Sequence, residues 1–379
     1  MKSCVSSLAV ALSSVVGAAL QTPGAKPTCS SCNDRGVFAC RACVKSGCRG
    51  SRDVDVCSEA KKCKTCAGAR FEECGKCERP LAADLPKRRT ELATWREALR
   101  PIDERLGHEL RHCESPHFVL TFDIQRVDTP GAGGAHAAMH VYLDRLESFF
   151  ADFCQDLSCT DKDFLAKTHV MLWGKEVDQE KASVEYTRQQ SNTESKLMGA
   201  KPVVSIFYDK NHMHEEYELH QAVVHQVAHC LLSNVFDGVW PGNIRGGWID
   251  EGSAHFYENK YFGEVRHYCY VESDSIQYFK FGRWESAVRA AVDKNESLGF
   301  LGVTGINTVE MTPEQRMFAW SFCDYILRAT PGKFGALAKA IKAKQPVAQA
   351  LSGTLGVSPF EFEAQWRQWV VASYSLKKK

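Results

Sequence analysis

The sequence predicts an α+β fold, in which a small cysteine-rich module precedes a small mixed sheet and a mainly helical domain. Runs rich in β-branched and aromatic residues at 117–124, 168–173 and 202–208 are typical of strands. Apolar residues then recur at helical spacing through most of the remaining chain. Four C-x2-C pairs lie within residues 29–77, and they account for the separate module.

Length and composition are those of a globular protein. A chain of 379 residues has room for one large domain with an accessory module, or for two domains. Hydrophobic residues make up 44% and charged residues 25%, which are ordinary values. The formal net charge of +1 gives no argument for a nucleic-acid partner or an anionic membrane surface. The 17 cysteines are the exception, and most of them precede residue 80.

Residues 1–20 have the pattern of a secretory signal sequence. A basic Lys2 is followed by a short apolar run that ends in small residues near Gly17 and Ala19. The run is short for a bilayer span, and a polar stretch with Pro and Gly follows it at once. We therefore expect cleavage near Ala19, a periplasmic or extracellular location and no membrane span after cleavage. An uncleaved anchor is the alternative.

The C-x2-C pairs form an internal repeat, because a C-x2-C-x7-C-x2-C unit recurs after 34 residues. The repeated residues are Cys29, Cys32, Cys40, Cys43, Cys63, Cys66, Cys74 and Cys77. Two such pairs supply the four thiolates of a tetrahedral zinc site, so the module has ligands for two zinc ions. The spacing allows nested or sequential pairing. Disulfides are the alternative in an exported chain, and Cys48 with Cys57 are candidates for a separate one.

The first unit, C-S-S-C-N-D-R-G-V-F-A-C-R-A-C, resembles the cysteine-rich module of DnaJ-type chaperones, of whose glycines Gly36, Gly47 and Gly68 remain. The resemblance implies zinc sites that can be nested, pairing first with last and second with third. A module at 21–80 with so little apolar content needs metal or disulfides to fold. We expect it to contact other proteins or to be purely structural.

Residues 81–114 are predicted to connect the two parts of the chain. Most of this connector is expected to be one helix that ends at about residue 113. Its apolar positions recur at intervals of three and four, which gives one packing stripe. They are Leu92, Trp95, Leu99, Ile102, Leu106 and Leu110. The charged residues on the other face are expected to be solvated.

The main chemical signal is H-Q-V-A-H, followed after a turn-rich segment by E-G-S-A-H-F-Y-E. On a helix, His225 and His229 project from one face toward a common point. Glu251, on a second helix, is placed to be the third ligand. These three residues would form the His2Glu set with an open fourth position that is typical of catalytic zinc. His212, His214 and His220 are expected to be solvated rather than ligands.

Gln226 occupies the position that carries the general base in the H-E-x-x-H motif. In that motif a Glu takes a proton from the zinc-bound water. An amide has no basic lone pair at neutral pH, although it can hold a water by hydrogen bonds. The metal site can therefore persist while hydrolysis is impaired.

At these residues the chain resembles the gluzincin metallopeptidases, especially the peptidase-MA-like group with W-x-x-E-G-x-A as its second motif. Trp248, Glu251, Gly252 and Ala254 match that motif, and Glu258 matches a Glu often found seven residues after the ligand. The resemblance implies a zincin-like domain over 115–379, with a small sheet beside the active-site helix and one edge strand able to pair with a peptide. Glu258 would then support the metal site from outside the ligand set.

Taken together, the sequence predicts an exported zinc-binding metallopeptidase-like protein that is weakly active or inactive and binds polypeptides. One alternative is an active zinc metallopeptidase in which Asp250, His255 or a zinc-bound hydroxide replaces the base. The other is a cysteine-rich structural or protein-interaction adaptor. For an oxyanion-stabilising residue the spacing selects none of the candidates, which are Tyr257, Tyr261, Tyr268, Tyr270 and Tyr325.

Overall fold

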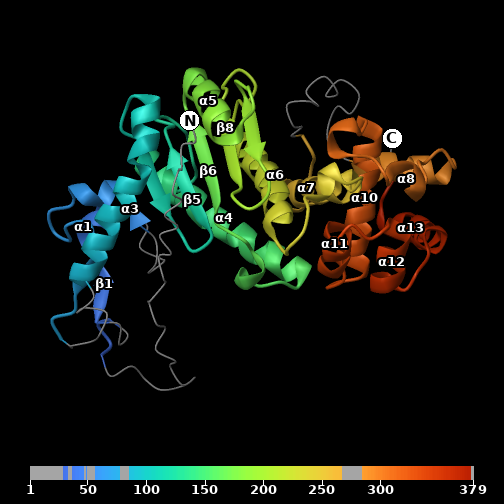
Figure 1. The fold of residues 1–379 in the computed structure, drawn as a ribbon, viewed down its shortest axis with the longest axis horizontal. Coiled ribbons are helices and arrows are strands. Elements are labelled where there is room, and N and C mark those ends of the chain that lie inside the picture. The colour runs from blue at the N-terminus through green and yellow to red at the C-terminus, as the bar shows by residue number, and fades with distance from the viewer. Residues whose placement is uncertain are drawn as a thin grey trace, which may run out of the picture. The chain divides into compact units, whose positions relative to one another are not determined.

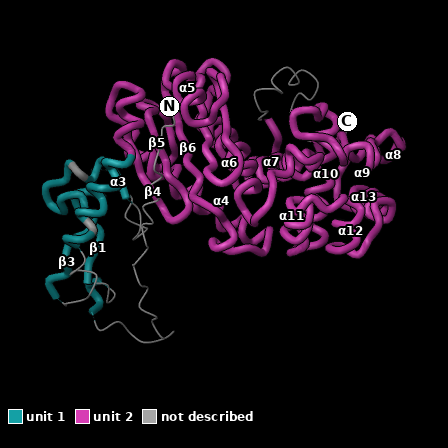
Figure 2. Tube along the Cα trace, in the orientation of Figure 1, with its two compact units in different colours: residues 1–98 teal, residues 99–379 magenta. Residues whose placement is uncertain are grey.

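The computed structural model forms two compact units, residues 1–98 and 99–379 (Figure 2). It describes residues 29–32, 36–46, 48, 56–76, 85–266 and 284–376. The α+β class predicted from the sequence is confirmed. The predicted signal sequence lies outside the described residues, as do Cys77, Tyr268 and Tyr270. No helix among the described residues is long and apolar enough to cross a membrane.

Unit 1 is built on a two-stranded antiparallel ladder. Strand β1 (Val37–Ala39) pairs with β3 (Phe71–Glu73), so that Val37 faces Glu73 and Ala39 faces Phe71. The other elements are α1 (Arg41–Lys45), β2 (Val56–Cys57) and the 3-10 helix η1 (Ser58–Lys62). The apolar core of this unit is small and consists of Val37, Ala69, Phe71 and Leu85. This core is too small to hold the unit by itself, as the composition predicted.

The predicted connector helix extends further toward the carboxyl terminus than the helix that the structure contains. Helix α3 spans Leu85–Leu106 and continues through Pro101. Gly107 then adopts a φ of +85°, which an L-residue in a helix does not, and the chain enters β4 (Arg111–Glu114). Leu110 is therefore not part of the helical stripe, but it packs with Leu106 in the same apolar cluster.

The sheet of unit 2 is mixed, with strand order β4-β5-β6-β8-β7 (Figure 1). The three predicted strands are its parallel centre, and they are β5 (Phe118–Phe122), β6 (Thr168–Trp173) and β8 (Val203–Phe207). Strand β7 (Glu194–Leu197) runs antiparallel to β8 and ends the sheet on that side. Neither β4 nor β7 was predicted from the sequence.

Helices form the remainder of unit 2, and those after β8 lead into a helical carboxyl-terminal half (Figure 1). The α-helices are α4 (Ala135–Leu157), α5 (Glu176–Ala182), α6 (Glu216–Asn234), α7 (Gly247–Phe262), α8 (Trp284–Asp293), α9 (Phe300–Val303), α10 (Pro313–Ala329), α11 (Phe334–Lys342), α12 (Val347–Leu355) and α13 (Pro359–Ser373). Short turns of helix occur at Asp161–Asp163, Ser183–Thr187, Pro241–Asn243 and Thr308–Glu310. Thr312 caps α10, because its hydroxyl accepts a hydrogen bond from the Gln315 N–H.

Helices α7 and α10 lie close together at Gly252, which follows Glu251 in the E-G-x-A motif. A Cβ at this position would lie 2.4 Å from the Ala319 carbonyl oxygen and 2.6 Å from the Cys323 sulfur. Both separations are below van der Waals contact, and one of the atoms belongs to the backbone of α10. The glycine is therefore required for the close packing that fixes the position of Glu251.

Gly252→Ala should lower the free energy of unfolding by about 1 to 3 kcal/mol, because the added methyl overpacks the crossing. Gly353→Ala is the matched control, since nothing lies within 4 Å of the Cβ it would add inside α12. That control should leave stability unchanged or raise it slightly. Urea unfolding followed by circular dichroism measures both changes. Equal stability of the two variants would contradict this account of the crossing.

Candidate metal centres

Helix α6 places the two histidines of the H-x-x-x-H motif on one buried face. Neither His225 nor His229 has exposed surface. Their Nε2 atoms are 3.2 Å apart, and their ring planes are inclined by 73°. The two nitrogens therefore point toward a common position, as the i,i+4 spacing predicts.

Helix α7 brings the fully buried Glu251 to the same position. Its Oε1 lies 3.9 Å from the Nε2 of His229, and the three predicted ligands offer atoms within 4.8 Å of one another. Zinc bonded to imidazole and carboxylate atoms at about 2.0 to 2.2 Å spans ligand pairs separated by roughly 3 to 4 Å. Both measured separations fall in that range, so the side chains of His225, His229 and Glu251 fit a zinc ion.

A buried carboxylate lies beside the outer nitrogen of each imidazole. Asp250 Oδ2 is 3.0 Å from the Nδ1 of His229, and Glu258 Oε2 is 3.4 Å from the Nδ1 of His225. A carboxylate in this place favours the tautomer with its proton on Nδ1 and leaves the Nε2 lone pair for a metal. Two such lone pairs facing each other across 3.2 Å repel unless a proton or a metal ion lies between them. Glu258 thus lies beside the outer nitrogen of His225.

Asp250 is itself held in position by hydrogen bonds. Trp240 Nε1 donates to its Oδ1 at 2.9 Å, and Thr308 Oγ1 donates to its Oδ2 at 2.8 Å. Burial alone raises the pKa of Asp250, but the adjacent His229 imidazole and these hydrogen bonds outweigh burial and place the pKa below its usual value. Asp250 is therefore an anion that orients His229, which leaves it poorly suited to be the replacement base considered from the sequence.

Arg316 is a member of the site that the sequence did not reveal. Its guanidinium comes from α10, is 3% exposed and lies 2.7 Å from Glu251 Oε1 through Nη1. Its Nη2 donates to the Thr308 carbonyl at 3.0 Å, and its Nε donates to the Met311 carbonyl at 3.2 Å. The guanidinium therefore offsets the charge of Glu251 at Oε1, the same oxygen that lies 3.9 Å from the Nε2 of His229.

His255 also belongs to this cluster, one helical turn after Glu251. Its Nε2 lies 3.5 Å from Glu251 Oε2, and its Nδ1 lies 3.2 Å from Glu258 Oε2. Together with His225 and Glu258 it forms a second group whose ligand atoms lie within 4.8 Å of one another. From the sequence, His255 was considered only as a replacement base. Its i+4 position after Glu251 places it on the same helix face, and this spacing could have indicated its place in the cluster.

Gln226 is buried, and both ends of its amide are engaged by strand β7. Its Nε2 donates to Glu194 Oε1 at 2.8 Å, and its Oε1 accepts from Lys196 Nζ at 2.7 Å. Glu194 and Lys196 are two residues apart on the strand, so they extend from the same face of the sheet. The amide is therefore oriented by the sheet, and it has less freedom to hold a water at the metal position than the sequence alone suggested.

Three of the tyrosines considered for oxyanion stabilisation lie in the described residues, and each of them contacts other side chains. Tyr257 packs in an aromatic group with Phe149 and Phe153. Tyr261 OH donates to Asp152 at 2.6 Å, and Tyr325 OH donates to Gln365 at 3.2 Å.

His220, which was predicted to be solvated, is only partly exposed. The imidazole packs edge-on against Tyr142 and Phe262, with ring centroids 6.1 and 5.1 Å away. Burial, together with the positive charge of Arg145, lowers the pKa of His220 to about 3. His212 and His214 are exposed, as expected.

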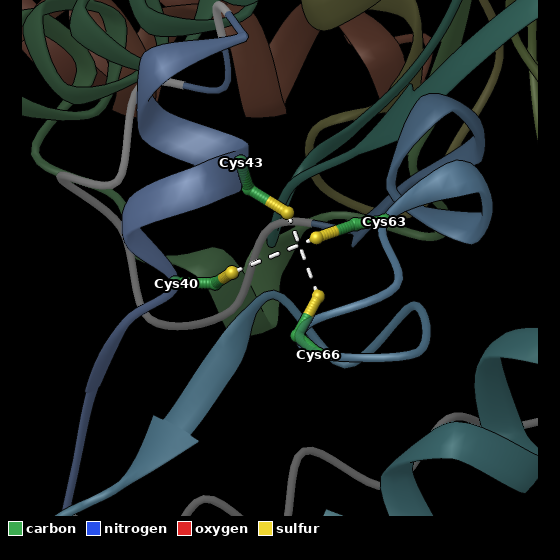
Figure 3. Close-up of side chains that lie close together, drawn as sticks. All are labelled: Cys40, Cys43, Cys63 and Cys66. Atoms are coloured by element: carbon green, nitrogen blue, oxygen red, sulfur yellow. Dashed lines mark hydrogen bonds between the residues drawn. The ribbon is translucent and has the colours of Figure 1, made fainter.

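In unit 1 the cysteines gather in a nested arrangement. The inner pairs meet, with 3.7 Å between the sulfurs of Cys40 and Cys63 and 3.5 Å between those of Cys43 and Cys66 (Figure 3). These separations are close to the roughly 3.8 Å edge of a tetrahedron with zinc–sulfur bonds of about 2.3 Å, and far from the roughly 2.05 Å of a disulfide. The four sulfurs point toward one centre and therefore fit a metal ion.

A second group joins the outer cysteines. Cys29, Cys32 and Cys74 offer sulfurs within 4.8 Å of one another, with 3.8 Å between Cys29 and Cys74. The Gly36 N–H points at the Cys32 sulfur at 3.2 Å, which is a contact that favours a thiolate. Cys77, the expected fourth ligand, lies outside the described residues.

The antiparallel ladder explains why the pairing is nested. Because β1 and β3 run in opposite directions, the end of β1 lies beside the start of β3, where the Cys40 N–H donates to the Arg70 carbonyl at 2.6 Å. At the other end, the Cys74 N–H donates to the Gly36 carbonyl at 2.8 Å. Each end of the ladder therefore collects cysteines from both repeats, and among the described cysteines the grouping is nested and not sequential.

The inner cysteine group cannot carry four negative charges without a cation. Burial raises the pKa of Cys66 to about 11, and the Cys43 thiol adds to that shift. Burial acts in the same direction on Cys63, but the backbone N–H groups of Cys66 and Thr65 outweigh it and lower the pKa of Cys63 to about 6. One thiolate therefore forms readily, and a divalent ion is needed to displace the remaining protons.

No disulfide joins any of the cysteines in the described ranges. Cys48 and Cys57, considered as a separate disulfide, are buried and share a hydrogen bond between their thiols. Cys154 and Cys159 are partly buried at the end of α4 and are likewise hydrogen-bonded to each other as thiols.

No family model matches the chain, and no curated protein shows significant similarity to it. The side-chain groups that could hold a metal ion are identified by their geometry.

Substitutions of paired cysteines should separate nested from sequential metal sites. Cys43→Ser with Cys63→Ser removes two ligands of one nested site, so the loss should be one zinc ion per chain. Cys63→Ser with Cys74→Ser disrupts both sites and should remove two. Mass spectrometry of metal content on the reduced chain measures the loss, with Cys159→Ser as a control that loses none. The reverse order of losses, or disulfides in place of bound zinc, would contradict the nested assignment.

Proposed function

We propose that unit 2 is a zinc-binding domain of the gluzincin metallopeptidase type that has weak or no hydrolytic activity and binds polypeptides. The observation that carries the proposal is the convergence of the His225 and His229 Nε2 atoms 3.2 Å apart, each imidazole with a carboxylate at its Nδ1. Glu251 supplies the third ligand atom. A His2Glu set of this kind is the ligand pattern of zinc in metallopeptidases.

Zinc at such a site supplies Lewis acidity, which polarises a carbonyl and lowers the pKa of a bound water. Hydrolysis also needs a group that moves the proton of that water, and this chain has Gln226 at the position of that group. Its amide lacks a basic lone pair, and Glu194 and Lys196 hold both of its ends. The general base is therefore missing, and the amide that replaces it is held in place by its hydrogen bonds to Glu194 and Lys196.

Strand β7 is the element best placed to bind an extended polypeptide. It is the last strand on its side of the sheet and consists of Glu194–Leu197. An extended segment can add to such an edge through backbone hydrogen bonds. The contacts from β7 to Gln226 link this edge to the helix that carries the metal ligands, so bound polypeptide would lie beside the metal position.

Unit 1 would hold two further zinc ions in its nested cysteine groups and act as a protein-contact or structural module. Zinc would supply the stability that the small apolar core lacks. The exported location proposed from residues 1–20 is compatible with zinc-bound cysteines, since metal coordination keeps thiolates from forming disulfides.

Exchanging the amide of Gln226 and the carboxylate of Glu194 tests whether the chain lacks a general base. Gln226→Glu alone places a second carboxylate beside Glu194, where the 2.8 Å contact now is, and the repulsion raises the pKa of one of them. Gln226→Glu combined with Glu194→Gln keeps one amide and one carboxylate in contact and restores a base on α6. Hydrolysis of an unstructured protein should rise by a factor of about 10² to 10⁴ in the double variant, and by less in the single variant.

Glu194→Gln alone is the matched control and should remain as inactive as the wild type. Metal content of each variant must be measured beside activity, so that loss of zinc is distinguished from loss of the base. Strong chelator-sensitive hydrolysis by the wild type, abolished by His225→Ala, would show that another base is at work. A wild type that binds no zinc at His225 and His229 would refute the proposal itself.

A further inference from the structure

A third group of ionisable side chains lies at the carboxyl end of the parallel strands in unit 2. Asp123 directly follows β5, and its N–H continues the ladder by donating to the Leu172 carbonyl of β6 at 2.8 Å. Asp178 lies in the first turn of α5. His108 follows the end of α3 by two residues. Three segments that are distant in sequence therefore bring one imidazole and two carboxylates together.

The geometry of this group leaves charged atoms poorly satisfied. His108 Nε2 is 3.5 Å from Asp123 Oδ1 and 3.8 Å from Asp178 Oδ2. Asp123 is 4% exposed and Asp178 is 3% exposed. Three of the buried atoms have no hydrogen-bond partner, and they are His108 Nε2, Asp123 Oδ2 and Asp178 Oδ2. Two carboxylates and an imidazole thus face one another without forming hydrogen bonds.

The other contacts of the two carboxylates offset little of their charge. Gln125 Nε2 donates to Asp123 Oδ1 at 3.2 Å. Lys175 Nζ is 3.8 Å from Asp178 Oδ2, and its side chain is 60% exposed, so the ion pair is weak. Burying two carboxylates so close together is costly unless a cation neutralises them.

We propose that His108, Asp123 and Asp178 bind a divalent metal ion, separate from the H-x-x-x-H and cysteine groups. One imidazole and two carboxylates are suitable ligands for Zn²⁺ or Mn²⁺. Two ligand atoms that each lie about 2.0 to 2.2 Å from an ion are at most about 4.4 Å apart. The separations of 3.5 and 3.8 Å therefore allow both pairs to share an ion without backbone movement.

Such an ion would cross-link the segment after α3, the end of β5 and the first turn of α5, in addition to the apolar contacts that already join Leu110 and Ala182. It would act structurally, because the three ligands come from separate elements and two of them are almost fully buried. Binding would then stabilise the folded state by mass action, since an unfolded chain does not hold the ligands together.

Zinc stoichiometry of the full chain tests the site. After saturation with Zn²⁺ and gel filtration, the wild type should retain one more ion per chain than Asp178→Asn or His108→Gln. The matched control is Asp209→Asn with His212→Gln, which removes an exposed histidine–aspartate pair and should leave the count unchanged. An equal count in the wild type and both site variants would overturn the proposal.

A second measurement on the wild type avoids reliance on variants that fold poorly. Zn²⁺ titration followed by the imidazole ¹⁵N resonances should shift those of His108 and leave those of His212 in place. His108 resonances that do not respond to Zn²⁺ would overturn the proposal.

Discussion

Unit 2 depends on neutralising a set of charged side chains that are sealed between α6, α7 and α10. Its members are Asp250, Glu251, Glu258, His225, His229, His255 and Arg316, and none is more than 3% exposed. Three carboxylates against one guanidinium leave two negative charges when the imidazoles are neutral. A buried excess of this size must be offset by one divalent ion or by two protons on the histidines. The same residues therefore determine both how the helices pack and whether a metal is retained.

The part of this set that follows from helical periodicity could be predicted from the sequence. His225 and His229 are separated by one helical turn, and Glu251 precedes a glycine that fits a close helix crossing. Arg316 could not be predicted, because it reaches Glu251 from a helix 65 positions later and no local pattern marks it. The predicted strands formed where β-branched runs are buried. Strand β7, with the sequence E-S-K-L, has no such run, and its pairing with β8 gives it strand structure.

The missed strand mattered most for the chemistry. From the sequence, Gln226 was a single replacement on a helix, with nothing to indicate its neighbours. In the structure it belongs to a three-residue set, since Glu194 and Lys196 complement the two ends of its amide. An amide is the group that can accept from an ammonium and donate to a carboxylate at the same time. The residue on α6 is thus matched to the residues on β7, and each restricts which substitutions the others tolerate.

The nested cysteine pairs also constrain the order in which unit 1 can assemble. Cys40 and Cys63 are 23 positions apart, whereas Cys29 and Cys74 are 45 apart. Loop-closure entropy favours the shorter loop only slightly in a free chain, by about 0.6 kcal/mol for each doubling of length. Once the inner group has closed, however, only the short segments of β1 and β3 remain between it and the outer group. A chain synthesised from its amino terminus therefore holds Cys29 and Cys32 without their partners until Cys74 has emerged, so unit 1 assembles from its centre outward.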